Sequence, residues 1–211
     1  NRDAIVVQVD TFALSDGDYA SRVYAFDAGA AFAGATSGYR LYTPDPDDYG
    51  GPQVPAITYD DYGSQLFVQM WNSDSDGEGY LRLWALGSGS GATLPPGPLV
   101  GPLPAWGTTA ATVNAGPQSS SANKLYLGDS WMMSVAYRNG TVWAAHSVFL
   151  PAGTPTRSAV QWLQISPSTG NVLQGSRIDD ADGASPQRFY AFPSIAVNAT
   201  MTVNAASGEA G

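Results

Sequence analysis

The sequence predicts an all-β protein, either a β-propeller or a partial propeller, built of about four antiparallel sheet repeats. An apolar strand, a polar turn and an aromatic-rich strand recur along the chain. Apolar and polar residues alternate with period two, which is typical of strands, and helical periodicity is nearly absent. The chain contains 24 Gly and 15 Pro, which favours many turns. Widely spaced β-repeats favour a propeller, because each sheet buries its faces against its neighbours.

The repeats are identified by pairs of strand-like segments. The four pairs are 4–7 with 23–26, 55–59 with 66–71, 133–137 with 141–145, and 192–197 with 201–203. Asn139-Gly140 predicts a tight hairpin turn within the third pair, because both residues tolerate positive φ. Farther on, Val160, Trp162 and Gln164 should share one face of a strand. Residues 28–35 are the one plausible helix, which its two glycines weaken.

Residues 1–211 fit a single domain, and residues 87–121 interrupt its rhythm. This segment is rich in Pro, Gly and Ser, so it predicts a long surface connection, which could be the rim of a binding face or simply a decorated loop. Only about three and a half repeats fit in the chain. We therefore expect a small four-bladed ring or, preferably, an incomplete ring completed by a second chain, a cleaved segment or further residues.

The composition limits the partners. A net charge of −9 opposes binding to phosphate backbones, so nucleic acid is not expected as a partner. The chain lacks Cys, and no apolar run approaches the 18 residues of a membrane-spanning helix. Few Lys and many Ser, Thr and Gly suit a secreted, extracellular protein, and a periplasmic location fits equally well.

Five runs carry a resemblance to a known group of proteins. They lie at residues 1–8, 80–83, 138–146, 158–162 and 189–198. Together they resemble the middle portion of large bacterial exported proteins with a sialidase-like β-propeller, mostly of undefined function. The resemblance covers roughly residues 1–198 and ends there, where such proteins continue into further blades. It implies secretion and a parent of six or seven blades, and it supplies no catalytic residues.

A calcium site is predicted in the run 72–78. Its candidate ligands are Asn72, Asp74, Asp76 and Glu78, which place oxygen atoms at alternate positions around Gly77. No helix flanks the run, so an EF-hand is excluded and a calcium-binding β-hairpin remains. The alternative interpretation is a solvated turn between two strands. Residues 179–183 form a shorter version of the same pattern.

A glycan or protein ligand is predicted to contact residues near strand ends and loops. The candidates are Trp106, Trp131, Tyr190, Arg138 and His146. Aromatic rings stack on the C–H faces of sugars, and polar side chains hold the hydroxyls. Core packing is the favoured alternative for any single ring. His146, on a strand beside Trp143, is expected to be a hydrogen-bonded structural histidine, with the role of a general base as the alternative. Trp71, Trp84, Trp143 and Trp162 are expected to pack between blades.

The sequence thus predicts a secreted β-propeller module that binds glycans or proteins or serves a structural role, with calcium as a candidate stabiliser. One alternative is a secreted glycoside hydrolase of sialidase-like fold, in which Asp129, Asp179 or Asp180 would supply carboxylates. Another is a subunit of a surface layer or filament. Whether the protein is an enzyme is left open.

Overall fold

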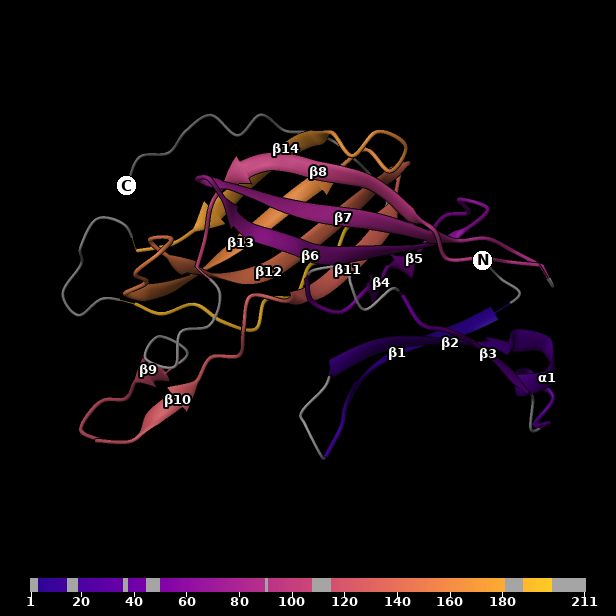
Figure 1. The fold of residues 1–211 in the computed structure, drawn as a ribbon, viewed down its shortest axis with the longest axis horizontal. Coiled ribbons are helices and arrows are strands. Elements are labelled where there is room, and N and C mark those ends of the chain that lie inside the picture. The colour runs from indigo at the N-terminus through magenta and orange to yellow at the C-terminus, as the bar shows by residue number, and fades with distance from the viewer. Residues whose placement is uncertain are drawn as a thin grey trace.

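The computed structural model describes residues 4–14, 19–35, 38–44, 50–89, 91–107, 115–180 and 188–198. In these residues the chain forms strands in antiparallel sheets with a single short helix, which confirms the all-β prediction. Three larger sheets follow one another along the chain, here named sheets A, B and C (Figure 1). No helix within the described ranges is long and apolar enough to span a membrane.

Sheet A is a three-stranded antiparallel meander. Its strands are β1 (Ala4–Phe12), β2 (Tyr19–Asp27) and β3 (Tyr39–Tyr42), in that order. The predicted helix forms only as α1 (Ala28–Phe32). Asp27 caps it by accepting a hydrogen bond from the Ala30 amide at 2.6 Å. The first predicted strand pair is therefore confirmed, and it forms the β1–β2 ladder.

Sheet B has the order β4-β6-β7-β8. Its strands are β4 (Val54–Pro55), β6 (Gln65–Ser75), β7 (Glu78–Leu86) and β8 (Pro96–Pro104). The prediction of a surface connection over residues 87–121 is wrong for β8, which is the outer strand of this sheet. The prolines are tolerated there because an edge strand has a second side that donates to no neighbour.

Sheet C has the order β14-β13-β12-β11-β5. Its strands are β5 (Ile57–Thr58), β11 (Met132–Arg138), β12 (Thr141–Leu150), β13 (Arg157–Ile165) and β14 (Val172–Ile178). Asn139 and Gly140 have φ values of 51° and 74° and join β11 to β12, as predicted. The small hairpin of β9 (Ala115–Pro117) and β10 (Lys124–Tyr126) projects from the sheets (Figure 1).

The three sheets are stacked, with sheet B between the other two. On one side of sheet B, Phe67 and Trp84 pack with Val23 of sheet A. On its other side, Val68 and Leu81 belong to the core that it shares with sheet C. That core is the larger of the two and includes Val142, Ala144, Val148, Leu150, Ala159, Leu163 and Ile165 of sheet C. Both faces of sheet B are therefore buried by neighbouring sheets.

The first strands of sheets A and B converge with β11 of sheet C. β1 contacts β4, and both β4 and β6 contact β11. The later strands of each sheet then follow outward in chain order. Residues 188–198, which are assigned to no strand, follow the opposite face of sheet C. The Ile195 amide there donates to Ser134 Oγ at 3.1 Å, and Arg138 donates to the Val197 carbonyl at 2.8 Å.

The number of sheets differs from the prediction of about four repeats. Three stacked sheets form, of which sheet C includes the parallel pair β5–β11, and they close no ring within the described part of the chain. The fourth predicted repeat begins with residues 192–197, which have no strand partner among the described residues. Its second segment, residues 201–203, lies outside the described ranges.

Candidate functional site

An acidic–aromatic cluster lies where the three sheets converge. It consists of Asp10 and Phe12 of β1, Tyr19 of β2, and Asp129 and Trp131 just before β11. The ring centroids of Phe12 and Tyr19 are 5.5 Å apart, and those of Tyr19 and Trp131 are 5.4 Å apart. These contacts make one aromatic row that bridges sheet A and the start of sheet C. Phe12, at one end of the row, is 60% exposed.

Asp10 is held by two neighbours in sheet A. Gln8 Nε2 donates to its Oδ1 at 2.7 Å, and the Tyr19 hydroxyl donates to the same atom at 3.1 Å. Asp10 and Gln8 lie on the same side of β1, because alternate residues of a strand share a face. Hydrogen bonding to the carboxylate therefore fixes the orientation of the tyrosine ring beside Trp131.

Asp129 and Trp131 are positioned by a tight turn and a glycine. The Trp131 amide donates to Asp129 Oδ1 at 3.1 Å. The indole lies directly over Gly51, where an added Cβ would be 2.5 Å from Trp131 Cδ1. Only glycine allows this approach, so the backbone before β4 forms a floor under the ring.

The two carboxylates of the cluster repel each other. Burial raises the pKa of Asp129, the Trp131 amide opposes this rise, and the negative charge of Asp10 adds to it. Burial together with Asp10 also raises the pKa of Tyr19 far above its usual range. The site therefore disfavours further negative charge and suits hydroxyl groups or cations.

Two of the predicted ligand residues are fully buried instead. Trp106 and His146 have 0% exposure, and their rings are in edge contact at 5.2 Å. His146 Nδ1 lies 3.0 Å from the Ser130 carbonyl and therefore donates to it. Its Nε2 lies 3.3 Å from the Gln161 amide nitrogen, whose partner oxygen accepts from Arg177. This network ties sheet C to Pro104 and Ala105, whose carbonyls also accept from Arg177.

Tyr190 and Arg138 were also predicted to contact a ligand. Tyr190 lies in the 188–198 segment, and Arg138 is the last residue of β11, the strand on which this segment lies. Arg138 is partly buried and stacks over the Tyr59 ring, with its guanidinium carbon 4.9 Å from the ring centroid. Its bond to the Val197 carbonyl uses part of its donor capacity. The structure thus separates the five predicted ligand residues into three places, and Trp131 alone joins the acidic–aromatic cluster.

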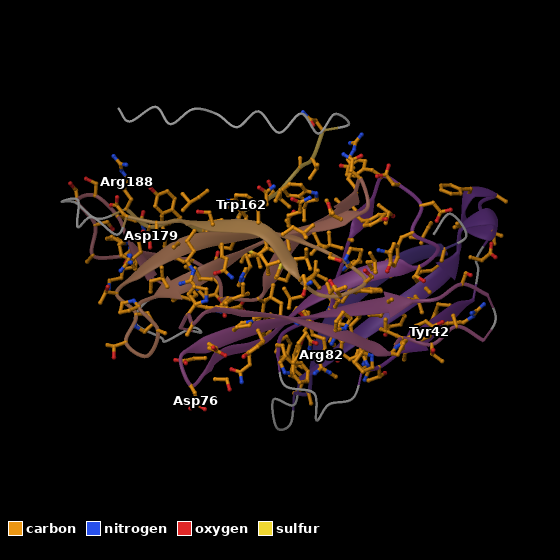
Figure 2. The ribbon with its side chains drawn as sticks, turned by 90° about the horizontal axis from the view of Figure 1, so that it is seen from above. Tyr42, Asp76, Arg82, Trp162, Asp179 and Arg188 are labelled. Atoms are coloured by element: carbon orange, nitrogen blue, oxygen red, sulfur yellow. The ribbon has the colours of Figure 1, made fainter. Side chains whose placement is uncertain are left out.

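The predicted calcium run covers the end of β6, the exposed turn at Asp76 and Gly77, and the first residue of β7. Asn72 Oδ1 accepts from the Asp74 amide at 3.0 Å, and Asp74 Oδ1 accepts from the Gly77 amide at 2.9 Å. Asp76 lies at the tip of this hairpin (Figure 2), and Glu78 accepts from the Tyr80 hydroxyl at 2.5 Å. No group of three or more acidic or His side chains suited to a metal ion occurs in the portion that the structure describes.

The remaining acidic candidates are already engaged. Asp179 forms an ion pair with Arg157 at 3.1 Å, and Asp180 accepts from the Arg188 amide at 2.8 Å. They lie at the end of β14, away from Asp76 (Figure 2). Residues 181–183 of the shorter calcium pattern lie outside the described ranges. Asp129 is thus the one predicted carboxylate that joins the acidic–aromatic cluster.

A concave surface lies between sheets A and B, apart from the acidic–aromatic cluster. It is a cleft of about 460 Å³, lined by Asp27, Tyr39, Arg40 and Tyr42 on one side and by residues 86–89 on the other. Arg40 donates to the Gly89 carbonyl across it. Its volume falls in the range of small-molecule sites, so it competes with the acidic–aromatic cluster as a ligand site.

Sequence reasoning missed Asp10, Phe12 and Tyr19. Their only local indication is the end of an alternating strand followed by Asp and Gly, which reads equally well as an ordinary turn. Their meeting with Trp131 depends on sheet stacking, which no local pattern encodes. In comparisons with known proteins, no protein-family model, no curated protein and no solved structure matches this chain.

Proposed function

We propose that this chain is a section of a secreted β-propeller that acts as a glycan-binding module, with the acidic–aromatic cluster as its ligand site. The observation that carries the proposal is the aromatic row of Phe12, Tyr19 and Trp131 beside two carboxylates. Sugars combine apolar C–H faces with rings of hydroxyl donors. Aromatic rings with adjacent carboxylate acceptors recognise both features.

The electrostatics favour a neutral or cationic sugar over an acidic one. Asp10 and Asp129 already raise the cost of negative charge at the site. The chain as a whole carries a net charge of −9, which repels anionic polymers over a longer range. We therefore expect neutral polysaccharides or amino sugars as ligands, and weaker binding of sialylated or sulfated glycans.

The stack of sheets supports the propeller part of the proposal. Each of sheets A, B and C arranges its strands in the order in which they occur in the chain, and β1, β4 and β11 lie together. Radial stacking of this kind is the arrangement of propeller blades. A secreted location fits the composition and the resemblance to exported bacterial proteins.

The proposal is tested by screening the purified chain on a glycan array and titrating the best neutral ligand by calorimetry. Trp131→Ala and Asp10→Asn should each weaken binding by about tenfold or more, because each removes a principal contact. Tyr42→Ala, in the cleft between sheets A and B, is the matched control and should leave the affinity within about twofold. Loss of glycan binding with Tyr42→Ala but not with Trp131→Ala would show that the ligand site is the cleft, which would contradict the proposal.

A hydrolytic function is the second candidate, favoured by the acidic pair itself. A carboxyl group whose pKa is raised by burial can donate a proton to a leaving group, and a second carboxylate can assist from the other side. In this version Asp129 is the acid and Asp10 the partner. Release of reducing sugar from a bound glycan, abolished by Asp129→Asn while binding persists, would establish hydrolysis. Binding of a glycan without its hydrolysis would exclude this second candidate and support the glycan-binding module.

A further inference from the structure

The outer face of sheet A is apolar and has no neighbour among the described residues. The register pairs Ile5 with Phe26 and Val7 with Tyr24, so these four side chains share this face. Sheet B lies against the opposite face. The exposed fractions on the open face are 39% for Ile5, 41% for Val7, 37% for Val9, 58% for Tyr39 and 42% for Leu41.

This open face is continuous. The rings of Tyr24 and Tyr39 are in edge contact at 5.1 Å, and those of Phe26 and Tyr39 are 5.9 Å apart. Arg22, opposite Val9, is the one charged residue that the register places on this face. A contiguous apolar surface rimmed by polar residues marks an interface.

Sheet C has a matching face on the side away from sheet B. Trp143 of β12 and Trp162 of β13 stack there, with centroids 6.3 Å apart and an interplanar angle of 16°. Val160 and Ile178 are paired on the same face, and Ile178 is 50% exposed. Residues 188–198 cover another part of this face, where Ile195 and Val197 bond to Ser134 and Arg138. Phe189 and Ala191 of this segment also pack against Phe149, which is fully buried. The open part is therefore the area around Trp143, Trp162, Val160 and Ile178.

The segment 192–197 resembles β4 in sequence and in position. Phe192-Pro193-Ser194-Ile195 matches the pattern of residues 54–57, Val-Pro-Ala-Ile. β4 lies beside β1, the first strand of the preceding sheet, and pairs with the edge of β6. Likewise, 192–197 lies beside β11, the first long strand of sheet C. Pro193, Ile195 and Val197 are partly buried against it, while Phe192, Ser194 and Ala196 are exposed.

We propose that a second copy of this chain supplies the missing sheet, a step that rests on the propeller part of the proposed function. The outer face of sheet A in one copy packs on the open face of sheet C in the other. Residues 192–197 then pair with the free edge of β1, as β4 pairs with β6. The same contact formed in reverse closes a ring of six sheets, within the range in which propellers close.

This arrangement continues contacts that the chain already makes. Sheet A packs on sheet B, and sheet B on sheet C, through the same kind of apolar face. Sheet A also lacks a short inner strand of the kind that β4 gives sheet B, within the described ranges. A second copy supplies both an apolar sheet and an inner strand, and it leaves no exposed apolar face at either end of the stack.

The test measures the mass of the full chain in solution by light scattering and native mass spectrometry over a range of concentrations. We expect a dimer of twice 22.0 kDa. Val7→Glu and Ile178→Glu each place a charge in the contact and should raise the dimer dissociation constant by roughly tenfold or more. Both side chains are substantially exposed in the single chain, so the variants should retain the wild-type circular dichroism spectrum.

Mixing the two variants distinguishes a head-to-tail ring from a face-to-face pair. The mixture retains one intact contact between the unmodified sheet A and the unmodified sheet C, so it should associate more tightly than either variant alone. Tyr126→Glu, on the projecting hairpin, is the control and should leave the dimer unchanged. A monomer at all concentrations, an open polymer, or a dimer insensitive to Ile178→Glu would overturn the inference. Glycan binding by a strictly monomeric chain would refute the ring and leave the proposed function standing.

Discussion

His146 Nε2 lies 3.3 Å from the side-chain amide nitrogen of Gln161 in a fully buried network. The oxygen of that amide accepts from Arg177 at 2.7 Å, so the nitrogen faces the imidazole and donates to it. Nε2 therefore faces an amide donor, and the cationic Arg177 lies on the other side of that amide. Burial, followed by the charge of Arg177, lowers the pKa of His146 to about 4, although its bond to the Ser130 carbonyl opposes the shift.

We predict that acid destabilises the fold through His146. The folded pKa lies below the value of about 6.5 in an unfolded chain, so the unfolded state binds a proton first as the pH falls. The contribution of neutral His146 to the free energy of unfolding is therefore fully present above about pH 6.5 and is lost as the pH falls from about 6.5 to about 4. Between pH 7 and 5 this loss amounts to about 2 kcal/mol. Urea unfolding at both pH values measures the loss.

His146→Gln is the control for this pH dependence. Carboxylates titrate in the same interval, so the quantity that matters is the difference in pH slope between the two proteins. The variant should be less stable at pH 7 and should lose about 2 kcal/mol less than the wild type on acidification to pH 5. Equal slopes would show that the imidazole is not held neutral in the folded protein.

A second prediction concerns the polar bridge inside the interface of sheets A and B. Trp84 Nε1 donates to Gln69 Oε1 at 2.8 Å, and Gln69 Nε2 donates to the Gly51 carbonyl at 2.9 Å. Gln69→Leu leaves a buried donor and a buried acceptor without partners, which should cost about 1–3 kcal/mol of unfolding free energy. Gln118→Leu, which removes only an exposed hydrogen bond to the Asn123 carbonyl, should change it by less than about 0.5 kcal/mol. Equal effects would contradict the bridge.

A third prediction concerns the contact between Gly79 and Trp106. A Cβ added at Gly79 would lie 2.1 Å from Trp106 Cζ3, and the indole is fully buried. Gly79→Ala should therefore force the ring to move and cost about 1–3 kcal/mol. Gly87→Ala is the matched control, because no atom lies within 4 Å of its added Cβ. Thermal melts of the two variants give the comparison, and a stable Gly79→Ala would show that Trp106 is loosely packed.

Calcium binding at residues 72–78 stays a prediction that a melting experiment can test. Asn72 and Asp74 each direct one oxygen to an amide of the turn, and Asp76 remains exposed at its tip. If calcium stabilises the hairpin, EDTA should lower the melting temperature and added Ca²⁺ should restore it. Asp76→Asn should then abolish the difference. A melting temperature that is unchanged by EDTA would remove the site.

The sequence predicted the local pairing of this fold better than its closure or its site. The Asn139-Gly140 turn and the alternation of Val160, Trp162 and Gln164 are local, and the structure has both as expected. β8 was missed because its prolines argue against a strand, and only its place at the edge of sheet B makes them tolerable. Pattern reasoning cannot say which strand lies at an edge.

The site was predicted least well, for a different reason. Trp106 looks like a surface candidate because it lies in a Pro- and Gly-rich segment, yet stacking of sheets B and C buries it completely. His146 is a ligand candidate too, but its place on a strand beside Trp143 favours the structural role in which it is found. Tyr19 and Trp131 are more than a hundred residues apart in sequence and meet only because sheets A, B and C converge. Contacts between sheets depend on the whole stack, which the repeat pattern indicates only in outline.

Hydrogen–deuterium exchange of residues 192–198 directly tests whether this segment pairs with β1 of a second copy of the chain. Among the backbone N–H groups of this segment, only that of Ile195 forms a hydrogen bond within the described residues. Pro193 has no N–H group. We predict that exchange slows in this segment and in β1 together as the concentration rises, and that the substitution Val7→Glu prevents this slowing. Fast exchange at every concentration, in a chain whose β6 and β12 stay protected, would contradict the claim.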